Sequence, residues 1–269
     1  MLLRESFRYL VSLAVISVDA LATLVGIWVH GALLRRELLS IPRDVFRMIE
    51  QGRGARMRWW RRAREEASTM GESVVWMRAH LSAPMAPVCF ATDARGPEPG
   101  DCGAYGIVGA DIEAATLRRY AEEIMCLGAS ITRLDGAYTG DRRQAEPWRA
   151  RKPLSRLPEE LFALSPESWV PISWGKWKYV DHITLGETRT VVKLAQILSA
   201  RVEAHGLRAL GLQDNMPCSA ALTKGRSPSP SLNHLARRKA GCCLGGDIGM
   251  LLPRVETYHQ PADALSRLV

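Results

Sequence analysis

The hydrophobic pattern of the chain changes period near Met85, and few architectures suit both halves of the pattern. From Leu10 to about Ala79, apolar residues recur every three or four positions, which is typical of helices. From Met85 onward, short apolar runs that end near Gly or Pro alternate with longer helical segments. Because strands interleaved with helices are typical of an α/β domain, we expect a helical segment over residues 1–84 and an α/β domain over residues 85–269.

The spacing of apolar and turn-forming residues also predicts the individual elements. In the first segment, Pro42 marks a break, and helices are expected over residues 42–51 and 53–66. In the second, strands are expected at 88–92, 103–109, 174–180, 207–212 and 251–258. Helices are expected at 114–127, at 186–205, from the loop 224–230 to about 244, and in a short segment containing Asp263. The stretch at about 111–168 exceeds the usual connection length, so we interpret it as a partly disordered insertion.

The apolar stretch Leu10–Leu34 permits a different interpretation, because about 20 such residues cross a bilayer. Asp19 lies in the middle of the stretch, and a central Asp costs about 2.5 to 3.5 kcal/mol on insertion scales. We therefore expect no membrane contact, and a membrane protein anchored by residues 10–34 is the minor alternative. No clean cleavage site follows the stretch before Arg35, so we expect an intracellular protein, cytoplasmic or nuclear.

The charge balance favours a polyanionic partner, although only weakly. The chain carries 36 Lys and Arg against 28 Asp and Glu, which gives a formal charge of +8. Between Arg53 and Glu66, arginines surround Trp59 and Trp60, and such a helix could contact phosphates or form a solvated face. The candidate nucleic-acid-binding residues are Arg58, Arg61, Arg62, Lys224 and Arg226. The six cysteines have neither the spacing of a zinc site nor that of a disulfide framework.

Four acidic residues are expected at the ends of elements in the α/β part. They are Asp93 and Asp214 after strands, and Glu187 and Asp263 at helix starts. A single acid at a helix start is more often a cap or a partner of the helix dipole, so the prediction of a site depends on the combination. Carboxylates that converge on one sheet edge can hold the hard cations that activate water for phosphodiester cleavage.

The surroundings of these acids resemble the ribonuclease H domains of retroelement reverse transcriptases, of DIRS-like and LTR type. The run Cys89–Ala94, followed by Gly103–Gly106, is similar to the first strand and hairpin of these domains, where the motif reads T-D-A-S before a Gly-rich return. The run His182–Glu187 resembles their H-I-N-x-L-E helix opening, with Gly186 in place of the usual Leu.

Two further motifs extend this resemblance toward the end of the chain. Gln213–Asn215 and Ala221–Ser229 are similar to the S-D-S/N strand end and to the K-G-R-S-x-S loop, which is the most specific match. Gln260–Arg267 resembles the N-P-A-D-x-x-S-R ending, with Gln260 where Asn is usual. The resemblance thus covers most of the chain apart from about 111–168, and it implies a ribonuclease H-like mixed sheet flanked by helices.

The N-terminal segment resembles the helical connection between polymerase and nuclease in the same reverse transcriptases. The residues that carry this likeness are Leu24–Trp28, Ala32–Arg36 and Arg58–Trp60. No Tyr-x-Asp-Asp motif and no Asp-Asp pair occurs in the sequence, so we expect no polymerase activity. A polymerase fragment of the same element is a candidate partner.

The resemblance implies that Asp93, Glu187, Asp214 and Asp263 are catalytic and hold two Mg²⁺ (or Mn²⁺) ions. It further implies endonucleolytic cleavage of the RNA strand of an RNA/DNA hybrid, by a nuclease from a truncated retrotransposon. His259 precedes the last acid, but its spacing does not match the mobile histidine of the family, and a surface role is favoured. The departures at Gly186 and Gln260 and the missing palm leave an alternative, a noncatalytic remnant that only binds nucleic acid.

Overall fold

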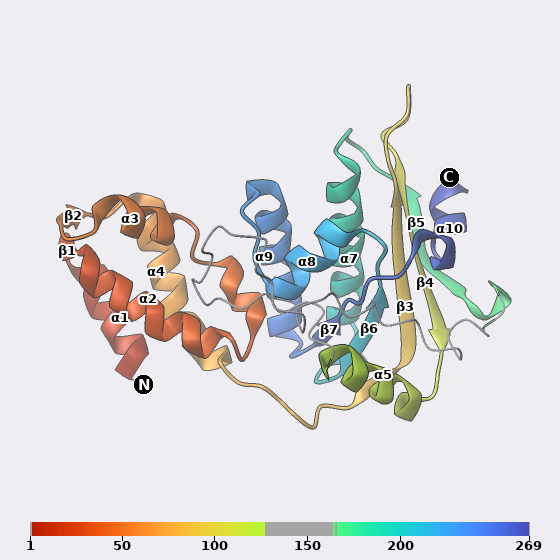
Figure 1. Cartoon of the computed structure of the whole chain (residues 1–269), viewed down its shortest axis with the longest axis horizontal. Coiled ribbons are helices and arrows are strands. Elements are labelled where there is room, and N and C mark those ends of the chain that lie inside the picture. Colours follow the sequence, from red (N-terminus) through yellow and green to blue (C-terminus); the bar gives the residue numbers. More distant parts are fainter. Residues whose placement is uncertain (1, 127–163, 165, 269) are drawn as a thin grey trace, which may run out of the picture. The chain divides into compact units, whose positions relative to one another are not determined.

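The computed structural model describes residues 2–126, 164 and 166–268, and these residues divide into two units (Figure 1). The first unit comprises the residues up to Ser82 together with Lys224–Gly245, and the second comprises Ala83–Thr223 together with the residues from Gly246 onward. Most of the expected insertion falls on residues 127–163 and 165, which lie outside the described part of the chain.

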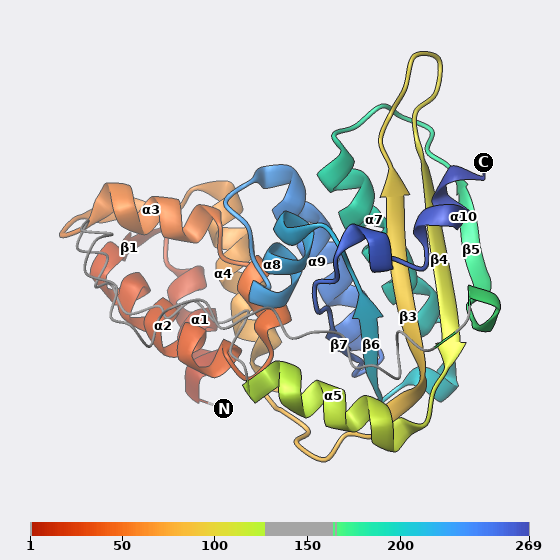
Figure 2. The ribbon, with the colours of Figure 1, turned by 45° about the vertical axis from the view of Figure 1, so that its right-hand side comes forward.

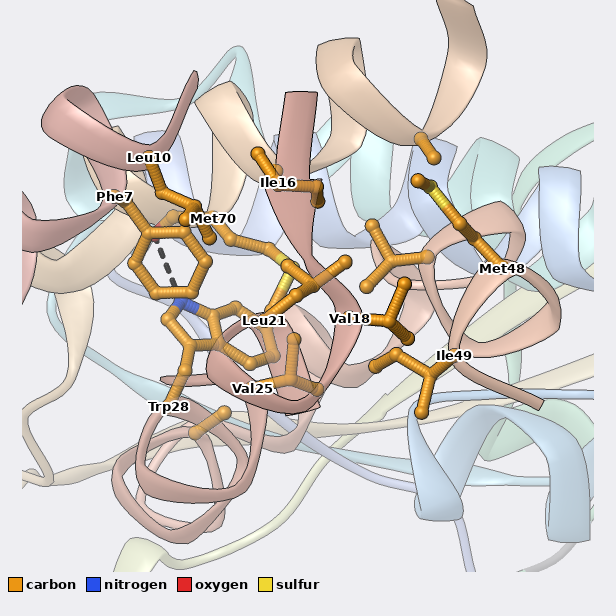
Figure 3. Packing of buried hydrophobic residues seen from close by; sticks show 14 of the residues in the cluster. Phe7, Leu10, Ile16, Val18, Leu21, Val25, Trp28, Met48, Ile49 and Met70 are labelled. Atoms are coloured by element: carbon orange, nitrogen blue, oxygen red, sulfur yellow. Dashed lines mark hydrogen bonds between the residues drawn. The ribbon is translucent and has the colours of Figure 1, made fainter. Parts of the chain in front are cut away.

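The first unit is mainly helical. Its helices are α1 (Leu2–Ser12), α2 (Val18–Ala32), α3 (Asp44–Gly52), α4 (Arg61–Ser73) and α9 (Pro230–Gly245), with short 3₁₀ helices η1 (Arg36–Ser40) and η2 (Val74–Trp76). Their apolar faces meet in a core that includes Phe7, Leu21 and Trp28 (Figure 3). The indole of Trp28 is fully buried, and its Nε1 donates a hydrogen bond to the carbonyl oxygen of Met70 at 2.8 Å. Burial of the polar edge of this ring is therefore compensated.

The apolar stretch near the N-terminus is not one continuous helix. A short strand, β1 (Val15–Ser17), separates α1 from α2 and pairs antiparallel with β2 (Arg56–Arg58). Ser17 begins α2 as its N-cap, with Oγ accepting a hydrogen bond from the amide of Ala20. Among the described residues, no helix is both long enough and apolar enough to cross a membrane.

The helix expected over residues 53–66 was wrong in its first half. Gly54 has a φ of +75°, a conformation that favours glycine and ends the preceding segment in a turn. The chain then forms β2, and α4 begins only at Arg61, after Trp60 in an extended conformation. Arg58 is consequently a strand residue, whereas Arg61 and Arg62 form the first turn of a helix.

The segment 224–245 packs with the first unit, although the sequence pattern had assigned it to the second part of the chain. Gly225 has a φ of +72°, and a Cβ at this position would lie 1.8 Å from the carbonyl oxygen of Arg36. In α9, Asn233 Nδ2 donates to the carbonyl oxygen of Ser40 at 2.9 Å, and the buried Lys239 pairs with Glu37 at 3.4 Å. The amphipathic pattern of a helix shows that it buries one face, but not which partner covers that face.

The second unit is a five-stranded mixed sheet flanked by helices. Its strands are β3 (Met85–Arg95), β4 (Ala104–Asp111), β5 (Val170–Lys176), β6 (Arg208–Leu212) and β7 (Gly249–Leu251). They are ordered β5-β4-β3-β6-β7, with β3 antiparallel to β4 and parallel to β6 (Figures 1 and 2). This arrangement confirms the expected α/β class and makes β3 the central strand.

Helices cover both faces of this sheet, which explains why β3 is buried along most of its length. The helices that pack on its strands are α5 (Ala114–Cys126), α7 (Ile183–Ser199) and α10 (Asp263–Arg267). The chain between these elements also forms α8 (Met216–Lys224) and the short 3₁₀ helices η5 (Pro166–Ser168), η6 (Val202–Ala204) and η7 (Thr257–His259). Phe90 of β3 packs in one cluster with Leu194 of α7. Cys89 packs in another with Leu117 of α5 and Leu265 of α10. Successive residues of the strand thus serve opposite faces.

Several boundaries differ from those expected from the sequence. The strand β3 continues to Arg95, so Asp93 lies within it and not at its end. The strand expected at 174–180 is β5 at Val170–Lys176, the one expected at 251–258 is β7 at Gly249–Leu251, and α8 was not expected. Short strands whose neighbours are set by tertiary packing leave little periodic signal in the sequence.

Candidate metal centre

Three acidic residues from distant parts of the chain meet in the second unit. Asp93, Glu187 and Asp214 each offer a carboxylate oxygen, and these oxygens lie within 4.8 Å of one another. Asp93 and Glu187 are only 4% and 3% exposed, so water screens their charges poorly. Buried carboxylates at this spacing match the oxygen ligands that hard divalent cations prefer, and the group could bind a divalent metal ion.

Strand register brings the two aspartates together. The strands β3 and β6 are parallel neighbours, with Ala91 paired to Leu212. Asp93 and Asp214 each follow these paired residues by two positions, so the chain delivers both to the same level of adjacent strands. Glu187 comes from the N-terminal part of α7, which packs on β3 and begins after the N-cap His182.

A glycine on β4 allows α10 to support Asp93. Gly106 pairs directly with Asp93, and a Cβ at this position would lie 2.9 Å from the amide of Ser266 and 3.0 Å from the carbonyl oxygen of Ala262. Because Gly106 has no side chain, α10 approaches the sheet closely. The hydroxyl of the buried Ser266 then donates a hydrogen bond of 2.5 Å to Asp93 Oδ2.

A buried hydrogen-bond relay orients Glu187. Thr92 Oγ1 donates to Gln213 Oε1 at 2.7 Å, and Gln213 Nε2 donates to Glu187 Oε2 at 2.8 Å. Gln260 Nε2 donates to the backbone oxygen of Thr92 at 3.1 Å, which links the segment before α10 to the same relay. Since Gln213 is completely buried, its amide group has one well-defined orientation and fixes the carboxylate that it contacts.

Burial and the charges of neighbouring acids raise the pKa values of two of these carboxyl groups. Burial, reinforced by the charge of Asp93, raises the pKa of Glu187 to about 9, although the hydrogen bond from Gln213 opposes this effect. Burial also raises the pKa of Asp93 to about 6, where the hydrogen bond from Ser266 opposes and the charges of Asp214 and Asp263 add to it. Without a cation, the group therefore retains a proton near neutral pH.

One oxygen of Asp214 has an unusual environment. Its Oδ1 atom is buried and accepts no hydrogen bond from any residue that the structure describes. Buried carboxylate oxygens are rarely left without a partner, because the loss of hydration is then uncompensated. A cation between the three acids would supply the missing interaction, and the residues present therefore fit such an ion.

The fourth expected acid, Asp263, lies outside this group of three. Its Oδ1 and Oδ2 atoms accept hydrogen bonds from Arg267 Nε, at 3.0 and 2.9 Å, across one turn of α10. The charge of Asp263 still raises the pKa of Asp93, so it acts on the site electrostatically. Of the four acids predicted from the sequence, the structure brings three together.

The residues that position these acids were not among the site residues predicted from the sequence. Thr92 and Gln213 immediately precede Asp93 and Asp214, and Ser266 follows Asp263 by three positions. Because these residues lie within the motifs around the acids, their position could have suggested that they support the site. Their hydrogen bonds, however, join residues up to 173 positions apart and depend on the sheet register.

The five basic residues expected to contact nucleic acid all belong to the first unit, whereas the acids belong to the second. All five are exposed: Arg58, Arg61, Arg62, Lys224 and Arg226. His259 follows the exposed Tyr258, and the two rings contact each other at a tilt of 53°, with centroids 4.0 Å apart.

No protein-family model matches the chain, and neither does any curated protein. The interpretation of the acidic group therefore depends on its own geometry and chemistry.

Proposed function

We propose that the chain is a metal-dependent endonuclease that cleaves the RNA strand of an RNA/DNA hybrid, the ribonuclease H part of a truncated retrotransposon reverse transcriptase. The observation that carries the proposal is the meeting of Asp93, Glu187 and Asp214, whose carboxylate oxygens lie within 4.8 Å of one another. The motif resemblance around these acids supports the choice of reaction. A mixed sheet flanked by helices is also the architecture that this resemblance implies.

The proposed cofactor is Mg²⁺ or Mn²⁺, which would activate a water molecule and shield the departing 3′ oxygen. Asp93, Glu187 and Asp214 would hold the ions, and Gln213 keeps the Glu187 carboxylate turned toward them. Near neutral pH, Glu187 holds a proton in the cation-free chain because its pKa is about 9. Cation binding would displace this proton, so metal affinity should rise with pH.

Selectivity for a hybrid would come from contacts to phosphates and 2′-hydroxyl groups and not from the reading of bases. The exposed arginines of the first unit supply positive charge suited to phosphates. A polymerase fragment of the same element is a further proposed partner.

The direct test is a gel assay of the purified chain with an end-labelled RNA/DNA hybrid. We expect Mg²⁺-dependent fragments of the RNA strand, no cleavage of the DNA strand and no products in the presence of a chelator. Duplex DNA of the same sequence serves as the matched control substrate. Absence of RNA fragments with both Mg²⁺ and Mn²⁺, under conditions where the chain is folded, would exclude the proposed activity.

The position of Asp263 favours a second candidate, a noncatalytic protein that only binds nucleic acid. Its carboxylate pairs with Arg267 and does not join the other three acids. A gel-shift measurement separates the two candidates, because a remnant of this kind would bind the hybrid without cutting it. Its binding would weaken steeply with salt, as expected for contacts between basic residues and phosphates.

A further inference from the structure

A cavity in the first unit, remote in sequence from the acidic group, has the chemistry of a ligand site. Its volume is about 430 Å³, and it is lined by Val11, Trp59, Arg61, Arg64, Glu65 and Ser68. Pockets for small molecules usually measure about 300 to 1,000 Å³, so this one can hold a single nucleotide or a molecule of similar size. The metal-centre residues do not contribute to it.

Helical spacing explains why this set of side chains shares one cavity. Arg61, Arg64, Glu65 and Ser68 recur at positions i, i+3, i+4 and i+7, which form one face of α4. This face lies beside the end of α1, where Arg64 Nε donates a hydrogen bond of 3.0 Å to the carbonyl oxygen of Val11. The contact holds the Arg64 guanidinium group at the cavity wall.

The charges of the lining favour an anion. Two arginines face one acid, and Arg61 pairs with Glu65 at 3.2 Å while its side chain is 91% exposed. An ion pair this exposed contributes little, so Arg61 can turn toward a ligand at small cost. The planar donor array of a guanidinium group matches phosphate oxygens well.

Trp59 supplies a flat apolar wall next to these cations. Its Nε1 atom is buried, so the part of the indole ring that lines the cavity is its carbon surface. Tryptophan also stacks on nucleobases regardless of their identity, since every base has a π face.

We propose that this cavity binds a nucleotide, with its phosphate on Arg61 and Arg64 and its base against Trp59. The site is separate from the proposed metal centre and does not depend on nuclease activity. A free mononucleotide and a nucleotide within an unpaired strand share this chemistry, and the experiment distinguishes them.

The test is calorimetric titration of the full chain, in the presence of a chelator, with four probes. They are AMP, adenosine, inorganic phosphate and a short unpaired oligoadenylate. AMP should bind about tenfold or more tightly than adenosine or phosphate, because each of these lacks one half of the recognised group. Binding of the oligoadenylate without binding of AMP assigns the site to a nucleotide within a strand.

The variant Arg61→Gln should weaken binding of the preferred probe about tenfold or more, because it removes the exposed phosphate contact without removing a packing residue. Arg56→Gln is the matched control, since Arg56 is an exposed arginine of the same unit that does not line the cavity. Failure of both AMP and the oligonucleotide to bind overturns the proposal, and so does equal binding by the Arg61 and Arg56 variants. Because the titration measures binding and not nuclease activity, neither its success nor its failure tests the proposed metal centre.

Discussion

Glu187 and Asp93 are carboxyl groups that the folded chain keeps partly protonated. Their burial, reinforced by the charges of neighbouring acids, outweighs the hydrogen bonds from Gln213 and Ser266, and both pKa values rise. The hydrogen bonds thus determine the orientation of the carboxylates, while burial, reinforced by the neighbouring charges, determines their affinity for a proton. In the cation-free chain, ionisation of these buried acids is therefore unfavourable.

The raised pKa values of Asp93 and Glu187 predict how the stability of the fold depends on pH. A carboxyl group with a raised pKa stabilises the fold below its unfolded pKa, and this contribution disappears as pH rises through the folded pKa. In a chelator, the melting temperature should therefore fall by several degrees from about pH 4 to pH 9, through the values of about 6 for Asp93 and about 9 for Glu187. Differential scanning fluorimetry across this range measures the change.

Two comparisons assign this pH dependence to the acidic group. Glu187→Gln should flatten the upper part of the curve, because the amide occupies a similar volume and does not ionise. Millimolar Mg²⁺ should also flatten the curve for the unmodified chain, by replacing the proton. An identical slope in the chelator for the Glu187→Gln variant would refute the assignment.

Asp214 distinguishes a metal ligand from a structural cap. Asp214→Asn preserves hydrogen-bonding capacity but removes a ligand charge, so it should reduce Mg²⁺-dependent cleavage of the hybrid by orders of magnitude. Binding to the hybrid and the melting temperature should change little, as gel shift and fluorimetry would show. The control is Asp111→Asn, at the exposed end of β4. Comparable cleavage by the Asp214 variant and the unmodified chain would mean that Asp214 is not a ligand.

At the scale of elements, the sheet and the helices fix where the acids meet. Elements with a long, regular apolar pattern were predicted closely, such as the helix expected at 42–51, which is α3 at Asp44–Gly52. The strand β5 begins four residues before the expected one, because its residues are mostly half-exposed or exposed and show no clear alternation. The three acids that meet were identified from their local motifs. Their supporting residues were not, because those contacts depend on register.

Gly106 tests the close approach of α10 to the sheet. A Cβ at this position would come within 3.0 Å of two backbone atoms of the α10 region, which cannot move as freely as a side chain. Gly106→Ala should therefore destabilise the chain by about 1 to 3 kcal/mol and lengthen the hydrogen bond from Ser266 to Asp93. Urea unfolding measures the loss of stability. The longer hydrogen bond should misplace the Asp93 carboxylate, so hybrid cleavage should also decrease.

The control for this substitution is Gly241→Ala in α9, where a Cβ would have no neighbour within 4 Å. That change should be neutral or slightly stabilising, because alanine favours helices more than glycine does. If Gly106→Ala proved as well tolerated as Gly241→Ala, close packing of α10 would not determine the geometry of Asp93.

At the scale of the whole molecule, the first unit is assembled from two segments that are distant in sequence. Glu66 joins them within this unit. Its Oε2 atom accepts hydrogen bonds from the first amides of α3, including that of Asp44 at 2.6 Å, and its Oε1 atom accepts one from Arg237 of α9 at 2.6 Å. No periodic pattern predicts this pairing, because it joins residues 171 positions apart. The K-G-R-S-x-S loop, the most specific motif in the sequence, leads into this contact.

Because α9 packs against the N-terminal segment, we expect α9 to be less stable in a fragment that contains only residues 83–269. In such a fragment, the face of α9 that carries Asn233 and Lys239 would lose η1, and amide hydrogens of residues 230–245 should exchange much faster than in the full chain. Residues 208–212 of β6, in the second unit, serve as the internal control and should stay protected. If β6 also lost protection, Gly225→Ala in the full chain would provide the test, because a Cβ there would lie 1.8 Å from Arg36. Equal protection of residues 230–245 in the fragment and in the full chain, or in the Gly225 variant and the unmodified chain, would show that α9 does not depend on the N-terminal segment.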